Sequence, residues 1–140
     1  MSIQSYRLTS RHFEAPVERL EFAFSTVAPL ATLHLKNADG LQLYTIELHP
    51  NTGTLQLSNH DGSADDFEQI VGEDGNFPPR LWVTYNNCEI KVGVHRSSDP
   101  RVSLQQDAAS EPREIWIIDL SADVYWQIFK PCPSFNIPPR

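Results

Sequence analysis

The segment from Arg80 to Gly93 reads Arg-Leu-Trp-Val-Thr-Tyr-Asn-Asn-Cys-Glu-Ile-Lys-Val-Gly, and its pattern of apolar residues determines how it pairs with itself. With Asn86 and Asn87 as the two loop residues of a tight hairpin, the cross-strand pairs are Tyr85–Cys88, Val83–Ile90 and Leu81–Val92. All of these apolar residues then lie on one face, as a half-buried antiparallel pair requires. Asn tolerates the positive φ of a two-residue hairpin turn. The segment therefore predicts a β-hairpin with one apolar face.

Short alternating runs separated by turn residues recur along the rest of the chain. A four-residue loop over 50–53 would pair Leu48 with Leu55 and Ile46 with Leu57, again on one side. Helical periodicity is hard to find. The run Asp123–Lys130 alternates Val124, Trp126 and Ile128 as a strand would, although Ala122–Phe129 is also compatible with a short helix. Many short strands at this spacing predict an all-β fold, an antiparallel jelly-roll-type β-sandwich of about ten strands. The predicted core contains Leu20, Phe22, Phe24, Leu33, Leu35, Ile46, Leu48, Leu55, Leu57, Leu81, Val83, Tyr85, Ile90, Val92, Val94, Ile115 and Ile117.

Length and charge limit the class of protein. The 140 residues predict one β-sandwich domain over 1–140, with an extended proline-rich tail over 131–140. The net charge of −7 and the lack of a basic stripe argue against a nucleic-acid or anionic-membrane partner. If the sequence is the whole natural product, the absence of an apolar leader or membrane span predicts a cytoplasmic protein.

Residues suited to catalysis are few. The predicted hairpin directs Cys88 into apolar surroundings beside Tyr85, where a thiol is inert. Cys88 and Cys132 are expected to be free thiols, although one disulfide between them stays open. No serine has an activating neighbourhood, and no glycine-rich turn would hold a phosphate group. The sequence therefore predicts a protein that is not an enzyme and that has no cofactor.

The segment from Asp61 to Gly75 is acidic, with six carboxylates and no Lys or Arg. We expect a short strand over 67–71, and mobile, exposed chain over 61–66 and 73–75. A calcium site is an alternative, since oxygen-rich loops suit that ion. Its ligands would be Asp61, Asp65, Asp66 and Glu68. A solvated acidic loop without metal is the favoured interpretation, because the spacing lacks the glycine and the final Glu of a calcium loop.

Trp82 is the most informative residue for function, because it stands on the hairpin face opposite the apolar one. Either a neighbouring loop covers the ring, or the ring is exposed for a ligand. An aromatic ring among polar groups on a β-surface suits sugar binding, because it stacks on the pyranose while its neighbours bind the hydroxyls. The leading prediction is a lectin-like carbohydrate-binding module with the site residues Trp82, His34, Glu47, Asn59, Asp61, Glu89 and His95. The alternative is a protein-interaction or assembly domain, homo-oligomer included, that uses a sheet face or an edge strand.

The same hairpin resembles that of the farnesoic acid O-methyltransferase-like domains. These domains carry an aromatic-Trp-aliphatic-x-aromatic strand, a turn and then x-Ile-x-Val-Gly, which Leu81–Tyr85 and Ile90–Gly93 follow except at Leu81. Upstream, Tyr44–Ile46 and Asn51 resemble a second part of the pattern, so the similarity would cover about residues 18–128. The resemblance implies a binding module rather than a methyltransferase. Similar strand-turn-strand sequence patterns occur in galectin-like and other concanavalin-type sandwiches, which form the broader class.

Overall fold

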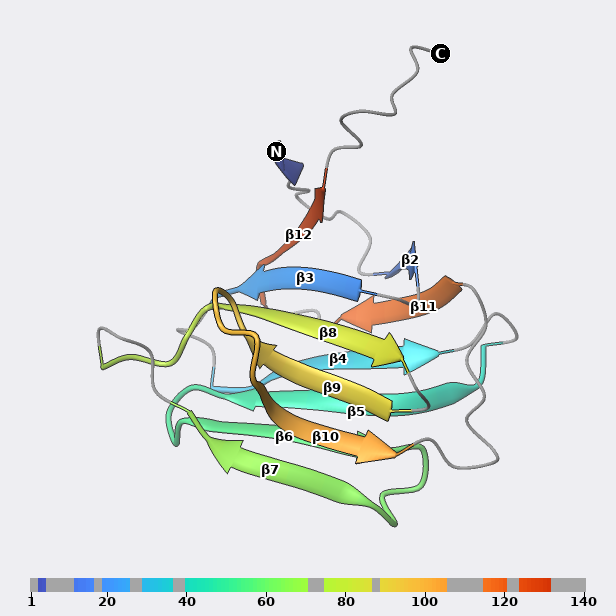
Figure 1. Cartoon of the computed structure of the whole chain (residues 1–140), viewed down its shortest axis with the longest axis horizontal. Coiled ribbons are helices and arrows are strands. Elements are labelled where there is room, and N and C mark those ends of the chain that lie inside the picture. Colours follow the sequence, from blue (N-terminus) through green and yellow to red (C-terminus); the bar gives the residue numbers. More distant parts are fainter. Residues whose placement is uncertain are drawn as a thin grey trace.

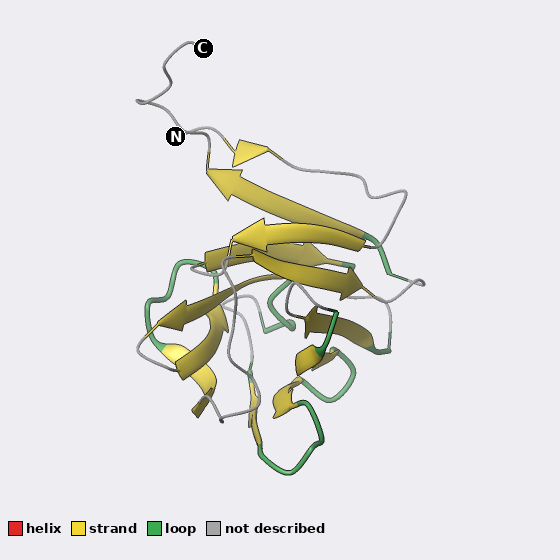
Figure 2. Ribbon diagram, turned by 90° about the vertical axis from the view of Figure 1, so that its right-hand side faces the viewer, coloured by secondary structure: helices red, strands yellow, loops and turns green. Residues whose placement is uncertain are grey.

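A computed structural model describes residues 3–4, 12–16, 19–25, 29–36, 40–70, 75–86, 89–105, 115–120 and 124–131. Within these ranges the chain forms two six-stranded sheets and no helix (Figure 2). The first sheet has the spatial order β1 (Ile3–Gln4), β12 (Trp126–Pro131), β3 (Arg19–Phe24), β8 (Arg80–Asn86), β9 (Glu89–Val94) and β10 (Pro100–Gln105). The second has the order β2 (His12–Pro16), β11 (Ile115–Leu120), β4 (Ala31–Lys36), β5 (Gln42–His49), β6 (Thr54–Asn59) and β7 (Asp65–Gln69).

The two sheets pack face to face as a jelly-roll-type β-sandwich, with β8, β9 and β10 in front of β4, β5 and β6 in Figure 1. All pairings within the sheets are antiparallel. Alternation of burial along the strands places one apolar set between the sheets. Strand β4, for example, buries Ala31, Leu33 and Leu35 and leaves the residues between them partly exposed. The predicted all-β class is confirmed, and the described part has twelve strands where about ten were expected.

The hairpin of β8 and β9 forms with a register two residues away from the predicted one. Asn86 pairs with Glu89, and residues 87 and 88 between them lie outside the described residues. The cross-strand pairs are Tyr85–Ile90, Val83–Val92 and Leu81–Val94. A shift of two residues keeps every side chain on its predicted face, since the side-chain period of a strand is two. Tyr85 therefore pairs with Ile90 and not with Cys88 as predicted. Cys88 and Cys132 both lie outside the described residues.

The other hairpin is confirmed. Ile46 pairs with Leu57 and Leu48 with Leu55, and the connection over 50–53 has the predicted four residues. The amide of Gly53 donates to the carbonyl oxygen of His49 at 2.9 Å, and Gly53 has a φ of 71°. Glycine suits this position because other residues are strained at such a φ.

Most of the predicted core is buried, with corrections near the C-terminus. Of the predicted core residues, Tyr85 and Val94 are partly buried against the core. In β11 the buried residues are Ile118 and Leu120, and the side chains of Ile115 and Ile117 lie outside the described residues. The helix considered over Ala122–Phe129 is wrong, because residues 126–131 form β12 and bury Trp126 and Ile128. The tail beyond Pro131 lies outside the described residues.

The acidic segment is more regular than the sequence predicts. Strand β7 covers 65–69 rather than 67–71, so Asp65 and Asp66 belong to a strand and not to a mobile loop. On its inner side, Asp66 accepts a hydrogen bond from the Ser103 amide at 3.0 Å, and Glu68 lies 2.7 Å from Arg101. These contacts join β7 to β10 and close one side of the sandwich with polar groups. Residues 71–74 lie outside the described ranges, and the described part contains no helix that could span a membrane.

Candidate functional site

The seven predicted site residues occupy three places instead of one. His34 and Glu47 lie on the outer face of β4 and β5, while Trp82 and Glu89 lie on β8 and β9 of the opposite sheet. His95 follows β9, and Asn59 and Asp61 lie at the turn after β6. The structure therefore does not bring the seven residues together, because the outer faces of the two sheets point in opposite directions and the core lies between the sheets.

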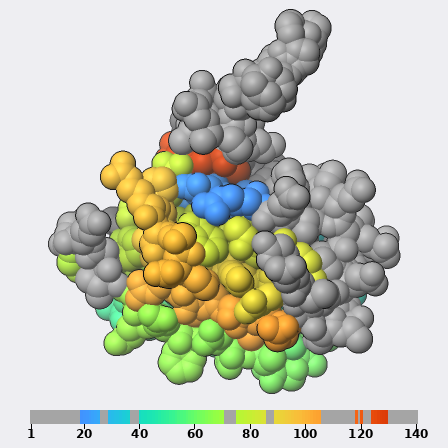
Figure 3. Space-filling model, in the orientation of Figure 1, coloured from blue at the N-terminus to red at the C-terminus, as the bar shows by residue number. Residues whose placement is uncertain are grey.

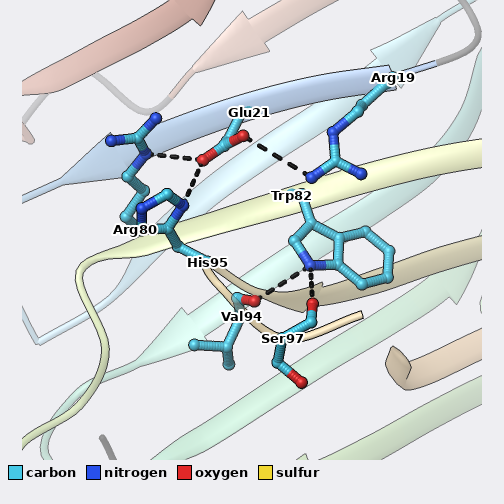
Figure 4. A network of polar contacts seen from close by, with 7 residues as sticks. All are labelled: Arg19, Glu21, Arg80, Trp82, Val94, His95 and Ser97. Atoms are coloured by element: carbon cyan, nitrogen blue, oxygen red, sulfur yellow. Dashed lines mark hydrogen bonds and ion pairs between the residues drawn. The ribbon is translucent and has the colours of Figure 1, made fainter. Parts of the chain in front are cut away.

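Trp82 is a covered residue, with 4% of its surface exposed. Its indole Nε1 donates hydrogen bonds to the carbonyl oxygens of Ser97 at 2.8 Å and Val94 at 3.0 Å (Figure 4). The ring lies against Gly93, its cross-strand partner, where a Cβ atom would come within 2.2 Å of the indole. The Arg19 guanidinium covers the ring at 5.3 Å from the centroid. Trp82 therefore fastens the turn after β9 to the sheet, and its ring is not open to a sugar.

His95 belongs to an ion cluster beside Trp82, centred on Glu21. One carboxylate oxygen of Glu21 lies 2.6 Å from His95 Nδ1 and 2.7 Å from Arg80 Nε, and the other lies 3.6 Å from Arg19 (Figure 4). The geometry between Glu21 and Arg80 is that of an ion pair rather than a hydrogen bond, since neither buried atom meets hydrogen-bond criteria. The cluster connects β3, β8 and the residue after β9, so His95 has a structural partner.

Asn59 and Asp61 organise the turn between β6 and β7. The Asn59 side chain accepts from the Ala64 amide at 3.1 Å and donates to the Ser63 hydroxyl at 3.2 Å. Asp61 accepts from the Ser63 amide at 2.9 Å. Hydrogen bonds from the hydroxyl and the amide of Ser63 hold the pKa of Asp61 below its usual value. Both side chains are used to hold the turn.

The outer face of β4 to β7 is the surface where polar groups and an exposed ring come together, and we call it the Phe67 face. Phe67 is 67% exposed and pairs across the strands with Gln56, which pairs with Glu47. A neighbouring row contains His34, Thr45, Ser58 and Asp65, and the last row contains His49, Thr54 and Gln69. Strands lie about 4.8 Å apart, so the face spans about 14 Å from β7 to β4, comparable to a short oligosaccharide.

Several polar side chains of the Phe67 face are already oriented by one another. Gln56 Nε2 donates to Asp65 at 3.2 Å, and His49 Nε2 lies 3.1 Å from Glu47 Oε1. Gln42 donates to the Thr45 hydroxyl at 2.8 Å, and that hydroxyl lies 3.3 Å from His34 Nδ1. The Thr45 hydroxyl has a single hydrogen. When it donates this hydrogen to Nδ1 of His34, the N–H of the imidazole is at Nε2. The face then offers fixed donors and acceptors around an exposed aromatic ring.

Sequence reasoning found His34 and Glu47 on this face and missed Phe67. The reason lies in β7, whose inner side carries Asp66 and Glu68 instead of apolar residues. Without an apolar inner side, the alternation that marks a strand is weak, so the sequence predicts a short strand that begins at Phe67 but does not identify an outward face for its ring. The available signal was the spacing Asp65-x-Phe67-x-Gln69, which places an aromatic residue between two polar ones on one face of a strand.

The calcium alternative depends on four carboxylates that the structure separates. Asp65 bonds to Gln56, Asp66 to the Ser103 amide, Glu68 to Arg101 and Asp61 to Ser63. Among the described residues, no three His, Cys, Asp or Glu side chains gather as metal ligands would. The four carboxylates therefore act as hydrogen-bond and ion-pair partners within the fold.

Comparison with solved structures places the fold in the galectin-type class of β-sandwiches. A tetrameric galectin from the ball sponge Cinachyrella and the galectin LEC-6 from Caenorhabditis elegans each have a TM-score of 0.56 and 12% sequence identity. In both comparisons the match covers 91% of this chain. It covers 95% of the sponge galectin and 96% of LEC-6. An exo-inulinase from Aspergillus awamori matches with a TM-score of 0.55 and 10% identity, over 94% of this chain but only 29% of the inulinase.

A scan against protein-family models finds no match, and neither does a search of curated protein sequences. The resemblance of the hairpin to farnesoic acid O-methyltransferase-like domains is therefore not supported beyond the sandwich architecture. At 10 to 12% identity the solved structures establish the fold alone. The chemistry of the surface must carry any functional conclusion.

Proposed function

We propose that this protein is a non-enzymatic, lectin-like carbohydrate-binding domain, and that the Phe67 face is its binding surface. The observation that carries the proposal is the exposure of Phe67, 67%, on a sheet face whose other outward side chains are polar. An exposed aromatic ring beside amides, carboxylates and imidazoles is the combination that binds a pyranose. The structural similarity to galectins, a class of lectins, supports the same function.

The proposed roles follow from position and chemistry. The Phe67 ring stacks on the apolar face of one sugar residue, next to Gln56 and Asp65 on the same face. Asp65 and Glu47 accept hydrogen bonds from sugar hydroxyls, and Gln56 and His34 donate them. Because Gln56 and Asp65 are bonded to each other at 3.2 Å, a sugar would meet side chains that are already ordered. Ordering before binding reduces the entropy that binding costs.

Replacing Phe67 tests the proposal directly. We expect Phe67→Ala to weaken binding to an oligosaccharide by about fivefold or more, because aromatic packing on a ligand contributes about 1 kcal/mol beyond area burial. Phe67→Tyr should restore it, since the ring is kept. The measurement is retardation on immobilised oligosaccharides that a glycan array has first identified.

Tyr125→Ala is the matched control, because Tyr125 is 73% exposed and lies on the opposite sheet just before β12. It should leave retardation unchanged. Equal retardation of wild type and Phe67→Ala on every retarding sugar would place the binding surface elsewhere and contradict the assignment.

The rival function is a protein-interaction or assembly domain, and one observation favours it. Phe67 lies on β7, which is the edge strand of its sheet in the described structure, and an exposed ring at an edge suits an interface. Against it, Asp65, Asp66 and Glu68 place three acidic residues on that short strand, and such charges protect edges from pairing. A dimer in solution that Phe67→Asp converts to a monomer, with no sugar binding, would support the rival function.

A further inference from the structure

A groove on the outer face of the first sheet collects positive charge in a protein whose net charge is −7. It has a volume of about 430 Å³ and lies over β3, β8, β9 and the turn before β10. Figure 3 views this side of the molecule, with β3 in blue, β8 and β9 in yellow, and the turn and β10 in gold and orange. Arg19, Lys91 and Arg96 line the groove, and we call it the Arg96 groove.

The three cations come together because of the sheet register. Arg19 pairs with Thr84, which pairs with Lys91, so these side chains form one row across three strands. The turn that carries Arg96 is held over the sheet by Trp82, through its hydrogen bonds to Val94 and Ser97. The covered Trp82 thus has a clear role: it fixes the third cation of the groove against the first two.

Nearby carboxylates do not cancel this charge. Glu21 is closest to Arg80 and His95, at 2.7 and 2.6 Å, and lies 3.6 Å from Arg19. Glu89 lies 3.7 Å from Lys91. Glu21 and Glu89 therefore face three cationic side chains, Arg19, Arg80 and Lys91, and Arg96 adds a fourth positive charge to this face. Asp99 is in the turn but not among the lining residues. The groove keeps an excess of positive charge.

The backbone of Arg96 supplies a second, independent observation. Its φ of 72° makes it the one non-glycine residue in the described part with a positive φ. An arginine costs free energy in this conformation, and glycine would be favoured there. Residues with a strained backbone of this kind concentrate at binding sites, where the function of the side chain offsets the strain. The side chain of Arg96 is exposed and lines the groove.

We propose that the Arg96 groove binds a sulfate or phosphate ester of a small polar molecule, such as an acidic sugar. Arg19, Lys91 and Arg96 bind the tetrahedral anion, and the hydroxyls of Thr84, Ser97 and Ser98 bind the polar remainder. Of the lining residues only Trp82 and Pro100 are apolar, and the Arg19 guanidinium lies over the Trp82 ring, so the groove favours a polar ligand over a lipid chain. The site is on the sheet opposite the Phe67 face, so the proposal does not depend on the proposed function.

The test is a titration followed by ¹⁵N NMR, with the Trp82 indole N–H as reporter. The probes are glucose 6-sulfate, glucose 6-phosphate and glucose. We expect saturable shifts with one or both esters, with a dissociation constant of about 1 mM or tighter, and none with glucose. The two ester probes separate sulfate from phosphate as the source of the anion. Binding should weaken strongly when salt is raised from about 0.05 to about 0.5 M, because the site is exposed and ionic.

Substitutions make the test specific. Lys91→Gln and Arg96→Gln should each weaken ester binding by about fivefold to tenfold. Arg96→Gly should weaken it equally while the protein stays as stable as wild type or more so, because glycine relieves the backbone strain. Lys36→Gln, which removes a charge from β4 on the opposite sheet, and Phe67→Ala should both bind the esters as wild type does. Equal shifts with glucose, no saturable shift with either ester, or wild-type binding by Arg96→Gln would overturn the proposal.

Discussion

Phe22→Ala is expected to lower the free energy of unfolding by about 4 kcal/mol, the typical cost of removing a large aromatic side chain from a core. Phe22 is fully buried in β3, between Leu81 of β8 and Ile128 of β12. Its ring centroid lies 5.9 Å from that of Trp126. The neighbours are large residues on paired strands and cannot close the space, so most of the cavity should persist.

The matched control is Phe67→Ala, the same substitution at a position that is 67% exposed. It should change the free energy of unfolding by no more than about 0.5 kcal/mol. Urea unfolding followed by fluorescence measures both, provided that the slope of free energy against urea is unchanged. A loss below about 1.5 kcal/mol for Phe22→Ala would show that β3 does not lie in the core as described.

Gly93→Ala is the second large effect, with an expected loss of about 2 to 3 kcal/mol. The new Cβ would come within 2.2 to 2.9 Å of three indole carbons of Trp82, so the ring or the strand must move. Movement of the ring breaks the hydrogen bonds from Trp82 to the carbonyl oxygens of Val94 and Ser97. Gly93 has an ordinary strand φ, so the clash and not backbone strain is the cause.

A double-mutant cycle with Trp82→Leu isolates this contact. Leu has no ring to meet the new Cβ, so Gly93→Ala should cost much less in the Trp82→Leu background than in wild type. Equal costs in both backgrounds would mean that Trp82 does not lie over Gly93.

How far the sequence predicts the fold is clearest from the two hairpins. The pairs Ile46–Leu57 and Leu48–Leu55 follow from a turn whose length Pro50 and Gly53 define. At the second hairpin, two Asn residues and a Cys offer two turn positions that keep the same apolar face, and the observed register pairs Asn86 with Glu89. Periodicity therefore predicts which face is buried, but a shift of two residues leaves that face unchanged and must be decided by the turn itself.

The candidate site was harder to predict, for a physical reason. Whether two polar side chains lie together depends on strand order, and alternation does not encode that β6 and β7 belong to one sheet while the hairpin of β8 and β9 belongs to the other. The sequence suggests that the Trp82 ring is exposed, because Trp82 is on the outer face of its strand. The turn over 94–97 and Arg19 cover it, and these contacts join residues distant in sequence. Of the two predicted readings of Trp82, coverage by a neighbouring loop is the one observed.

The most direct test of the account is an NMR map of where a bound neutral oligosaccharide touches the protein. The ligand is one selected on a glycan array, and the observables are backbone amide shifts together with saturation transfer from the Phe67 ring. The account predicts shifts concentrated on β5, β6 and β7, with the largest near Phe67 and Gln56, and little change around Trp82. Shifts concentrated on β8 and β9, or no binding to any glycan at high protein concentration, would contradict it.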